Sequence, residues 1–482
     1  MKNTFIIERT TISESWGRPP FAMLVALIGY GIVLFARQVL NDGDTYWHIA
    51  AGDWILRNGF VPHADPFSFS AAGAPWVAQE WLSEVTMALA YKAGAWDAIV
   101  MLFGAVTALA FGLLAHFLRR WLTQPAAMVL FILAAACVAP SLLTRPHILV
   151  LPILVLWSAG LILAKDKGTS PSLLLLPLML LWANLHASFV FGLVLTLPIA
   201  LEALVETKAD RGRVVRSWGI FFVAATAVSL LTPNGLHGLL YPFEVLSMPH
   251  LSFIGEFAPT DFGKFQPLEG ILMALLYFAF TRQIRLPIPR LILLIGLLHL
   301  ALQHGRNQMI AGIVGALILA EPIGRALGGG RDESADCLPS VRWAFLGLAY
   351  VMLLTVFRVA HPVVHTDDGA SPTTALNHVP AEILRQPVFN SYEFGGYLIF
   401  RNIKPFIDGR ADVYGDEFLA NYVAATTPNG AAFERIVEKY GIRWAILNAK
   451  STTLDMLDAL PHWRRLYADR IAVVYVRDEK RQ

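Results

Sequence analysis

Eleven apolar stretches of 14–23 residues dominate this sequence and restrict what it can fold into. A helix of about twenty apolar residues is long enough to cross the hydrocarbon core of a membrane. Of the 482 residues, 56% are hydrophobic and only 15% are charged, whereas roughly a quarter are charged in soluble domains. The sequence therefore predicts a mainly α, polytopic helical membrane protein. The predicted spans are residues 21–37, 96–118, 125–141, 148–164, 171–185, 188–205, 217–233, 268–281, 289–304, 307–325 and 341–359.

The distribution of basic residues predicts the side on which each connection lies. Connections on the cytoplasmic side are enriched in Lys and Arg. With a cytoplasmic N-terminus, eleven crossings place 17 basic residues inside and six outside. Counting residues 77–93 as a further crossing would move the basic cluster at 208–216 to the outside. We therefore interpret 77–93 as a helix on the membrane surface. The net charge of +2 gives no indication of a nucleic-acid partner.

The residues after the last span have the composition and alternating pattern of a small soluble α/β domain. We predict two domains: a transmembrane domain over 1–360, whose first outer loop covers 38–95 with surface helices, and an extracytoplasmic domain over 361–482. Strands are predicted at 387–390, 397–400, 405–408, 443–448 and 471–476, and helices at 417–426, 431–441 and 453–460.

Several polar motifs fall in the outer connections, next to the spans. They are TRPH (144–147), NLHAS (184–188), TPNGLHG (232–238), IGEF (254–257) and HGRN (304–307). Charged and polar groups at membrane depth are expensive and are usually functional. Because these motifs share one face, we predict a site there.

Four longer motifs resemble the GT-C glycosyltransferases, membrane enzymes that take sugar from a polyprenyl-phosphate carrier. The motifs are DTYWHIAAGDWILRNGFVPHADPFSFSAAGAPWVAQEWL in the first outer loop, and FNSYEFGGYLIFR, FIDGRADVYGDEF and HWRRLYADRIAVVYVR in the tail. The resemblance is to a bacterial branch and covers most of the chain. It implies an inverting GT-C-type enzyme of the bacterial inner membrane, with its active site and C-terminal domain on the periplasmic side. The implied substrates are a polyprenyl-phosphate-linked sugar donor and a glycan, lipid or protein acceptor, among membrane lipids.

A carboxylate must take the acceptor's proton in such a transfer. The resemblance assigns this role to an aspartate just after the first span, and Asp44 matches that place, with Asp42 as the alternative. The Asp-Gly-Asp spacing also leaves open a divalent cation, although no cofactor is identified. The structural alternative is that both acids are solvated and cap a helix that begins at Thr45.

Arginines are expected to bind the leaving phosphate, because the guanidinium group matches phosphate oxygens in pairs. Arg145 and Arg306 are the candidates, supplemented by His147 and His304. The alternative is that both arginines lie at span ends and extend into the lipid headgroups.

Further polar residues of the outer face are candidate substrate contacts. They are His48, Asp65, Glu80, His186, His237 and Glu256. Trp47 and Trp54 are expected to anchor the helix 45–57 in the membrane interface. Asp408, Arg410, Asp412 and Tyr414 are expected to form a salt-bridged turn rather than to contact acceptor.

Three other functions fit parts of the pattern. A lipid-linked glycan ligase or polymerase would share the outer site but use a preassembled chain. A non-catalytic scaffold would keep the fold without the chemistry. A transporter should show inverted repeats or broken helices near the middle of the membrane, and the sequence shows neither.

Overall fold

The structure is a computed structural model that describes residues 20–208, 210–249, 255, 258–282, 284–329, 340–427 and 429–478. The predicted substrate contact Glu256 lies outside these described residues.

Most described elements are helices. Up to residue 360 they are α1 (Phe21–Phe35), η2 (Arg37–Leu40), α2 (Gly43–Asn58), α3 (Trp81–Arg119), α4 (Gln124–Val138), η3 (Ala139–Ser141), α5 (Pro146–Leu149), α6 (Leu151–Asp166), η4 (Leu173–Leu175), α7 (Leu176–Leu185), α8 (Phe189–Glu206), α9 (Arg211–Ser229), α10 (Gly235–Leu246), α11 (Pro267–Thr281), α12 (Ile288–Gln303), η7 (Gly305–Asn307), α13 (Gln308–Ala326) and α14 (Val341–Ala360). The later elements are α15 (Thr373–Asn377), α16 (Ala381–Leu384), β1 (Val388–Asn390), η9 (Tyr392–Phe394), α17 (Gly395–Phe400), α18 (Ala411–Tyr414), α19 (Asp416–Thr426), α20 (Gly430–Tyr440), β2 (Trp444–Asn448), α21 (Thr453–Ala459), β3 (Trp463–Ala468) and β4 (Ala472–Arg477).

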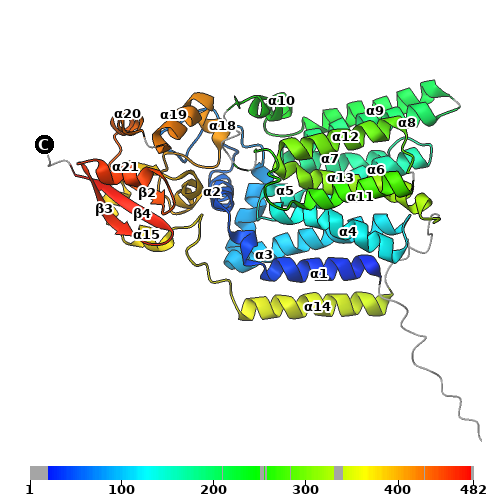
Figure 1. Ribbon diagram of the computed structural model, residues 1–482, viewed down its shortest axis with the longest axis horizontal. Coiled ribbons are helices and arrows are strands. Elements are labelled where there is room, and N and C mark those ends of the chain that lie inside the picture. Colours follow the sequence, from blue (N-terminus) through cyan, green and yellow to red (C-terminus); the bar gives the residue numbers. More distant parts are fainter. Residues whose placement is uncertain are drawn as a thin grey trace, which may run out of the picture.

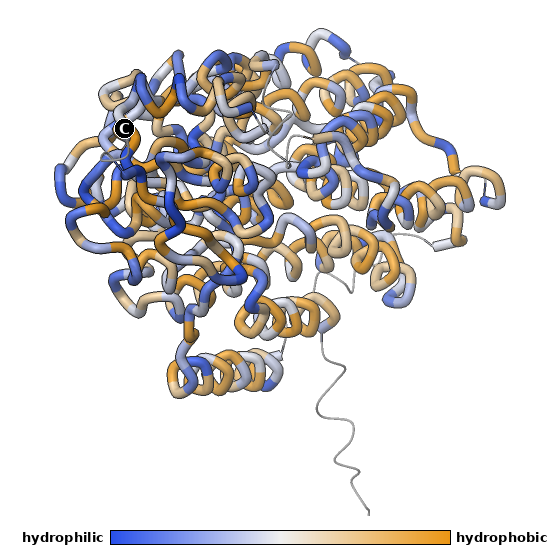
Figure 2. Tube along the Cα trace, turned by 60° about the vertical axis from the view of Figure 1, so that its left-hand side comes forward, coloured by the Kyte–Doolittle hydropathy of each residue, from blue (hydrophilic) through white to orange (hydrophobic). Residues whose placement is uncertain are grey.

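Each predicted span coincides with a described helix: α1, the later part of α3, α4, α6 to α9, and α11 to α14. Five described helices are long and apolar enough to cross a membrane, and four further apolar helices are shorter. The long helices run side by side in one bundle (Figure 1). Large apolar side chains such as Phe280, Val341 and Phe345 are exposed on them, and Figure 2 shows long hydrophobic stretches along these helices. This surface is that of an integral membrane protein.

The predicted break between the helix 77–93 and the next span is present inside α3. Gly94 and Ala95 have non-helical dihedral angles there, and Ala95 has a φ of +50°. A positive φ is unfavourable for alanine, so neighbouring contacts must hold this kink. The helical part before the kink packs against α2, and its Glu84 is buried.

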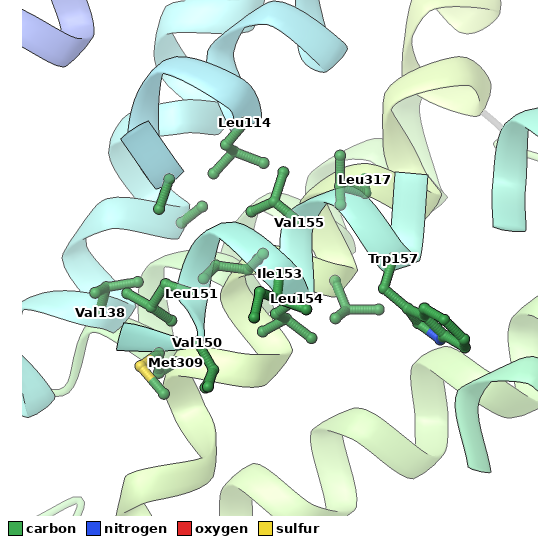
Figure 3. Packing of buried hydrophobic residues seen from close by; sticks show 14 of the residues in the cluster. Leu114, Val138, Val150, Leu151, Ile153, Leu154, Val155, Trp157, Met309 and Leu317 are labelled. Atoms are coloured by element: carbon green, nitrogen blue, oxygen red, sulfur yellow. The ribbon is translucent and has the colours of Figure 1, made fainter. Parts of the chain in front are cut away.

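The helices α6 and α13 form the centre of the bundle. In Figure 3, side chains of α6 such as Leu151 and Val155 lie among residues of three other helices. These are Leu114 of α3, Val138 of α4, and Met309 and Leu317 of α13. Glycine permits close packing at one crossing, because a methyl group on Gly312 would lie 2.9 Å from Cβ of Cys137 in α4.

The C-terminal sheet has the strand order β1-β2-β4-β3. β1 is parallel to β2, while β4 is antiparallel to both of its neighbours. The predictions for β1, β2, β4, α19, α20 and α21 are therefore confirmed. The strand β3 was not predicted.

The predicted strand at 397–400 is wrong, because these residues belong to the helix α17. A short apolar run does not distinguish a strand from a buried helix. Here Tyr397, Leu398 and Ile399 are all buried. The helix begins with Gly395 and Gly396, and a methyl group on Gly396 would lie 2.1 Å from the Gly43 carbonyl oxygen. Gly396 thus lets α17 pack closely against α2, and Gly395 lets it pack against Ile407 and Asp408.

The predicted strand at 405–408 is also wrong, because this segment is irregular. Its backbone bonds to a side chain instead of a neighbouring strand. The side-chain oxygen of Asn390 accepts from the amides of Phe406 and Ile407, and its amide donates to the Ile407 carbonyl. One buried asparagine therefore replaces a strand partner for these residues.

The C-terminal segment lies at one end of the helix bundle, next to α2 (Figure 1). We call this the covered end; it also contains the connections 36–80, 139–147, 186–188, 230–234 and 304–307. Of the two predicted interface anchors on α2, Trp47 is buried against the protein, whereas Trp54 is half-buried. Trp47 is 7% exposed and contacts Trp76 with its ring edge, at 6.4 Å between centroids.

Candidate active site

Asp42 and Asp44 share one arginine at the start of α2. Asp42 caps this helix by accepting from the Thr45 amide and hydroxyl, both at 3.1 Å. Its other oxygen lies 2.5 Å from a guanidinium nitrogen of Arg145, and a second nitrogen lies 3.1 Å from Asp44. The helix cap of the structural alternative is present at Asp42, but that alternative also had both acids solvated, and Asp42 is buried.

The environment of Asp42 favours its charged form. Burial alone would raise its pKa, but the charge of Arg145 and hydrogen bonds from Arg145 and Thr45 together hold the pKa below its usual value. Asp42 is therefore a fixed anion that orients Arg145. Asp44 keeps a side-chain exposure of 18%, so it is the acid of this pair that remains accessible.

Two histidines and two glutamates form a second group beside this pair. His48 comes from α2, and His186 from the connection after α7. Glu80 immediately precedes α3, and Glu84 lies in the first turn of that helix. His186 Nε2 lies 3.0 Å from Glu80. His48 lies 3.6 Å from Glu80 on one side and 3.6 Å from Glu84 on the other.

The hydrogen bonds of His186 fix its tautomer. Its Nδ1 accepts from the Ser188 amide at 3.1 Å and faces the Ser188 hydroxyl at 2.8 Å. The hydroxyl also accepts from the Trp182 indole at 3.0 Å. Since Nδ1 accepts, Nε2 carries the proton of the neutral ring and donates it towards Glu80.

Glu80 has an unusual protonation equilibrium. Burial raises its pKa to about 8, with a further increase from the charges of Asp44 and Asp412 that Arg306 and Arg145 partly offset. His48 is shifted the other way: burial, then the charges of Arg145 and nearby histidines, lower its pKa well below the usual value. A carboxyl group that titrates near neutral pH is suited to proton transfer.

The remaining predicted phosphate ligands also lie at the covered end. His147 Nε2 donates to the Ser141 carbonyl at 2.8 Å, and its ring lies 6.2 Å from that of His186. Arg306 is exposed in η7, next to His304 at the end of α12. Its charge acts on both Glu80 and His186, so Arg306 and Arg145 both influence the protonation of Glu80.

Asp65 has a different position from the one expected of a substrate contact. Its side chain is fully buried and accepts from Arg410 at 2.6 Å, from the Phe67 amide at 2.9 Å and from Ser68. These contacts favour a structural role over the predicted acceptor contact.

The tail motif forms the predicted salt-bridged turn. Arg410 binds Asp408 through two nitrogens, at 2.8 and 2.7 Å, and the Tyr414 hydroxyl donates to the same carboxylate at 2.5 Å. The guanidinium carbon also lies over the rings of Phe67 and Trp76, at 5.1 and 4.9 Å from their centroids. Arg410 therefore joins the first outer loop to the C-terminal segment.

Three residues near this site, Glu84, Tyr241 and Gly409, were absent from the predicted set, and Asp412 was expected only in the salt-bridged turn. Glu84 is four residues after Glu80, a helical spacing that the sequence displays. Asp412 and Tyr241 hydrogen-bond to each other, and both interact with the charge of Glu80. Gly409 lies against Asp44, because a methyl group on it would be 1.8 Å from a carboxylate oxygen. His237, which was predicted, is exposed on α10 and faces Glu244 at 3.4 Å.

No group of three or more His, Cys, Asp or Glu side chains within the described ranges is arranged to hold a metal ion. The guanidinium group of Arg145 lies between the two acids of the Asp-Gly-Asp motif. Arg145 thus supplies the positive charge that a cation would supply there.

The chain matches no protein-family model and no curated protein. Solved structures do match. The archaeal oligosaccharyltransferase AglB from Archaeoglobus fulgidus, in complex with an inhibitory peptide and a dolichol-phosphate, has a TM-score of 0.57 at 14% identity, over 89% of this chain and 69% of that chain. The oligosaccharyltransferase of the same organism in complex with Zn and sulfate has a TM-score of 0.50 at 11% identity, over 95% and 73%. ArnT from Cupriavidus metallidurans bound to undecaprenyl phosphate has a TM-score of 0.43 at 13% identity, over 95% and 98%.

Over 89% of its length, the chain therefore shares the fold of the solved oligosaccharyltransferase AglB, as the GT-C resemblance of the sequence implied. At identities of 11–14%, the similarity establishes the fold. The reaction has to be argued from the geometry of the covered end.

Proposed function

We propose that the protein is a membrane glycosyltransferase that moves a sugar from a polyprenyl-phosphate-linked donor to a glycan, lipid or protein acceptor on the extracytoplasmic face. The observation that carries this proposal is the convergence of two partly exposed acids, Asp44 and Glu80, with Arg145 and Arg306 at one end of a GT-C bundle. Sugar transfer from a lipid phosphate needs a proton acceptor and cations for the leaving group.

Asp44 is the proposed base for the acceptor hydroxyl. Its partial exposure supports contact with a water-soluble acceptor, and the Asp42–Arg145 pair fixes its orientation. The acceptor oxygen attacks the anomeric carbon from the side opposite the phosphate, which inverts the configuration in a single displacement. The electron pair of the broken bond leaves with the lipid phosphate.

The leaving phosphate is assigned to Arg306 and Arg145. Arg306 is exposed, so the phosphate of a lipid in the surrounding membrane can reach it first. Arg145 binds two acids and is assigned to the phosphate oxygens on the side opposite Arg306. His147 and His304 are assigned to the same phosphate as additional ligands. Charge-assisted bonds of this kind contribute about 1.5–3 kcal/mol each.

The test is donor turnover by the purified full-length protein in lipid nanodiscs, measured as release of free undecaprenyl phosphate from lipid-linked sugars extracted from the expression host. Asp44→Asn preserves the shape of the side chain and removes the base. We expect turnover to fall by at least about 100-fold, with an unchanged melting temperature.

The matched control is Asp53→Asn, because Asp53 lies on the same helix and pairs with the exposed side chains of Arg57 and Lys92. This variant should turn over donor like the wild type. Absence of lipid phosphate release by the wild type with every donor preparation would refute the proposed function, whereas full activity of Asp44→Asn would refute only the assigned base.

A further inference from the structure

The four side chains Glu84, His48, Glu80 and His186 form a continuous chain of titratable groups. Its three contacts measure 3.6, 3.6 and 3.0 Å. Exposure differs sharply along it: Glu80 is 22% exposed, whereas His48 and Glu84 are 3% and 1% exposed. His186, at the other end of the chain, is 13% exposed. Among the two carboxyl groups of the chain, a proton can therefore enter from the side of the substrate through Glu80 and not through Glu84.

The buried end of the chain is incompletely hydrogen-bonded. Among the described residues, neither His48 Nδ1 nor Glu84 Oε2 has a hydrogen-bond partner. A buried polar group without a partner is costly, and native structures rarely retain one without a role. Since His48 Nδ1 and Glu84 Oε1 are 3.6 Å apart, a movement of a few tenths of an ångström would make a hydrogen bond that can pass a proton.

The charges around the chain come from every element that packs against it. Asp44 acts on it from the start of α2, Arg145 from the connection before α5, and Arg306 from η7. His147 acts on it from α5. Arg410 and Asp412 act from the C-terminal segment. Tyr241 is linked to the chain through Asp412.

Asp44 itself is a poor place to keep a proton. Its negative charge is matched by Arg145 at 3.1 Å. Protonation of Asp44 would leave part of that guanidinium charge unmatched in a partly buried site, which is unfavourable. The proton that Asp44 removes therefore needs a second acceptor that is more stable in its neutral form.

We propose that Glu80 is this second acceptor, and that His48, Glu84 and His186 form a proton reservoir behind it. The inference rests on the proposed function. As the acceptor oxygen bonds to the anomeric carbon and the lipid phosphate departs, the hydroxyl proton moves to Asp44 and then to a carboxylate oxygen of Glu80. The carboxylate of Asp44 and its ion pair with Arg145 are thereby restored, and Glu80 later releases the proton to solvent.

The proposal has a definite pH dependence. Because the pKa of Glu80 is raised to about 8, its carboxyl group is protonated at lower pH and cannot receive a further proton. We expect kcat/KM for donor turnover to rise as the pH increases towards about 8 and to level off above it. In Glu80→Gln, kcat/KM should fall by about 100-fold and this inflection should disappear. Glu80→Asp should regain part of the activity together with an inflection.

The control is Glu206→Gln, which removes a half-exposed glutamate at the opposite end of α8 and should keep the wild-type profile. A merely structural role of Glu80 would lower the activity of Glu80→Gln equally at every pH and keep the inflection. That result would overturn the proton reservoir while leaving the glycosyltransferase proposal intact.

A second measurement does not depend on turnover. Infrared difference spectra of the wild type against Glu80→Gln should contain a protonated-carboxyl band that titrates near pH 8. The absence of such a band would contradict the proposal even if donor turnover proved undetectable. Its presence in a protein without turnover would support the protonation behaviour of Glu80 and refute the transfer reaction alone.

Discussion

Arg145 connects the candidate base to the candidate phosphate site. One nitrogen contacts Asp42 and another contacts Asp44, so the planar fork of the guanidinium group serves two carboxylates at once. Lysine carries the same charge on a single nitrogen and cannot reproduce this geometry. Arg306 differs, because it is exposed in η7. A substitution there should weaken substrate binding more than it lowers the stability of the fold.

The arginines can be tested by Arg306→Lys and Arg145→Lys, with Arg120→Lys at the opposite end of the bundle as control. Arg306→Lys should keep the wild-type melting temperature and lose donor turnover, because lysine cannot bind two phosphate oxygens in the paired geometry of a guanidinium group. Arg145→Lys should lose turnover and also about 1–3 kcal/mol of stability, because buried Asp42 loses part of its pairing. Turnover and thermal unfolding are measured for all three proteins. Wild-type turnover in Arg306→Lys would mean that Arg306 only extends into the lipid headgroups.

At the level of elements, the sequence predicted the helices much better than the short C-terminal elements. Long apolar runs determine membrane helices almost alone, because the bilayer excludes other backbone arrangements. The runs at 397–400 and 405–408 are only four residues long, and their structure depends on distant partners. The segment 397–400 is held against the Gly43 carbonyl of α2 through Gly396, and Asn390 binds the backbone of the segment 405–408. Neither partner is visible from local pattern.

The sequence predicted those candidate site residues that are charged and lie directly beside an apolar span. Asp44, Arg145 and Arg306 flank predicted spans, and the structure brings them to one end of the bundle. The contact between Asp412 and Tyr241 was not predicted, because it joins the C-terminal segment to α10 across more than 150 residues of chain. Only the folded topology reveals such a pair.

The contact between the tail motif and α2 can be tested by a substitution at Gly409. A methyl group on Gly409 would lie 1.8 Å from an Asp44 oxygen, so Gly409→Ala must displace either the acid or the segment. Overpacking of this kind typically costs about 1–3 kcal/mol, and we expect a lower melting temperature together with reduced turnover. Gly430→Ala is the control, because nothing lies within 4 Å of its added methyl group. Equal behaviour of the two variants would show that the tail does not press on Asp44 in the working protein.

Over the whole molecule, the two ends of the bundle carry different kinds of charge. The covered end holds partly exposed acids, histidines and arginines. The opposite end holds a buried ion-pair network, in which Glu202 of α8 binds Arg290 of α12 at 2.7 Å and Lys165 of α6 at 2.8 Å. Breaking such a network is costly, since it strands buried charges. The ion pairs at the opposite end therefore hold α6, α8 and α12 together. At the covered end, by contrast, Asp44 and Glu80 remain partly exposed.

The basic residues predict that the covered end faces away from the cytoplasm. Arg213 lies at the beginning of α9, at the opposite end, and Lys450 is exposed on the C-terminal segment. In a background without Cys137 and Cys337, single cysteines at these positions report the orientation. In intact cells an impermeant maleimide should label Lys450→Cys and spare Arg213→Cys, because cytoplasmic connections carry the excess of Lys and Arg. After the membrane is permeabilised, both should react, which shows that the shielded thiol is accessible in principle. The reverse pattern would place the acids and Arg306 on the cytoplasmic side, where the acceptor and the lipid-linked donor would have to be sought instead.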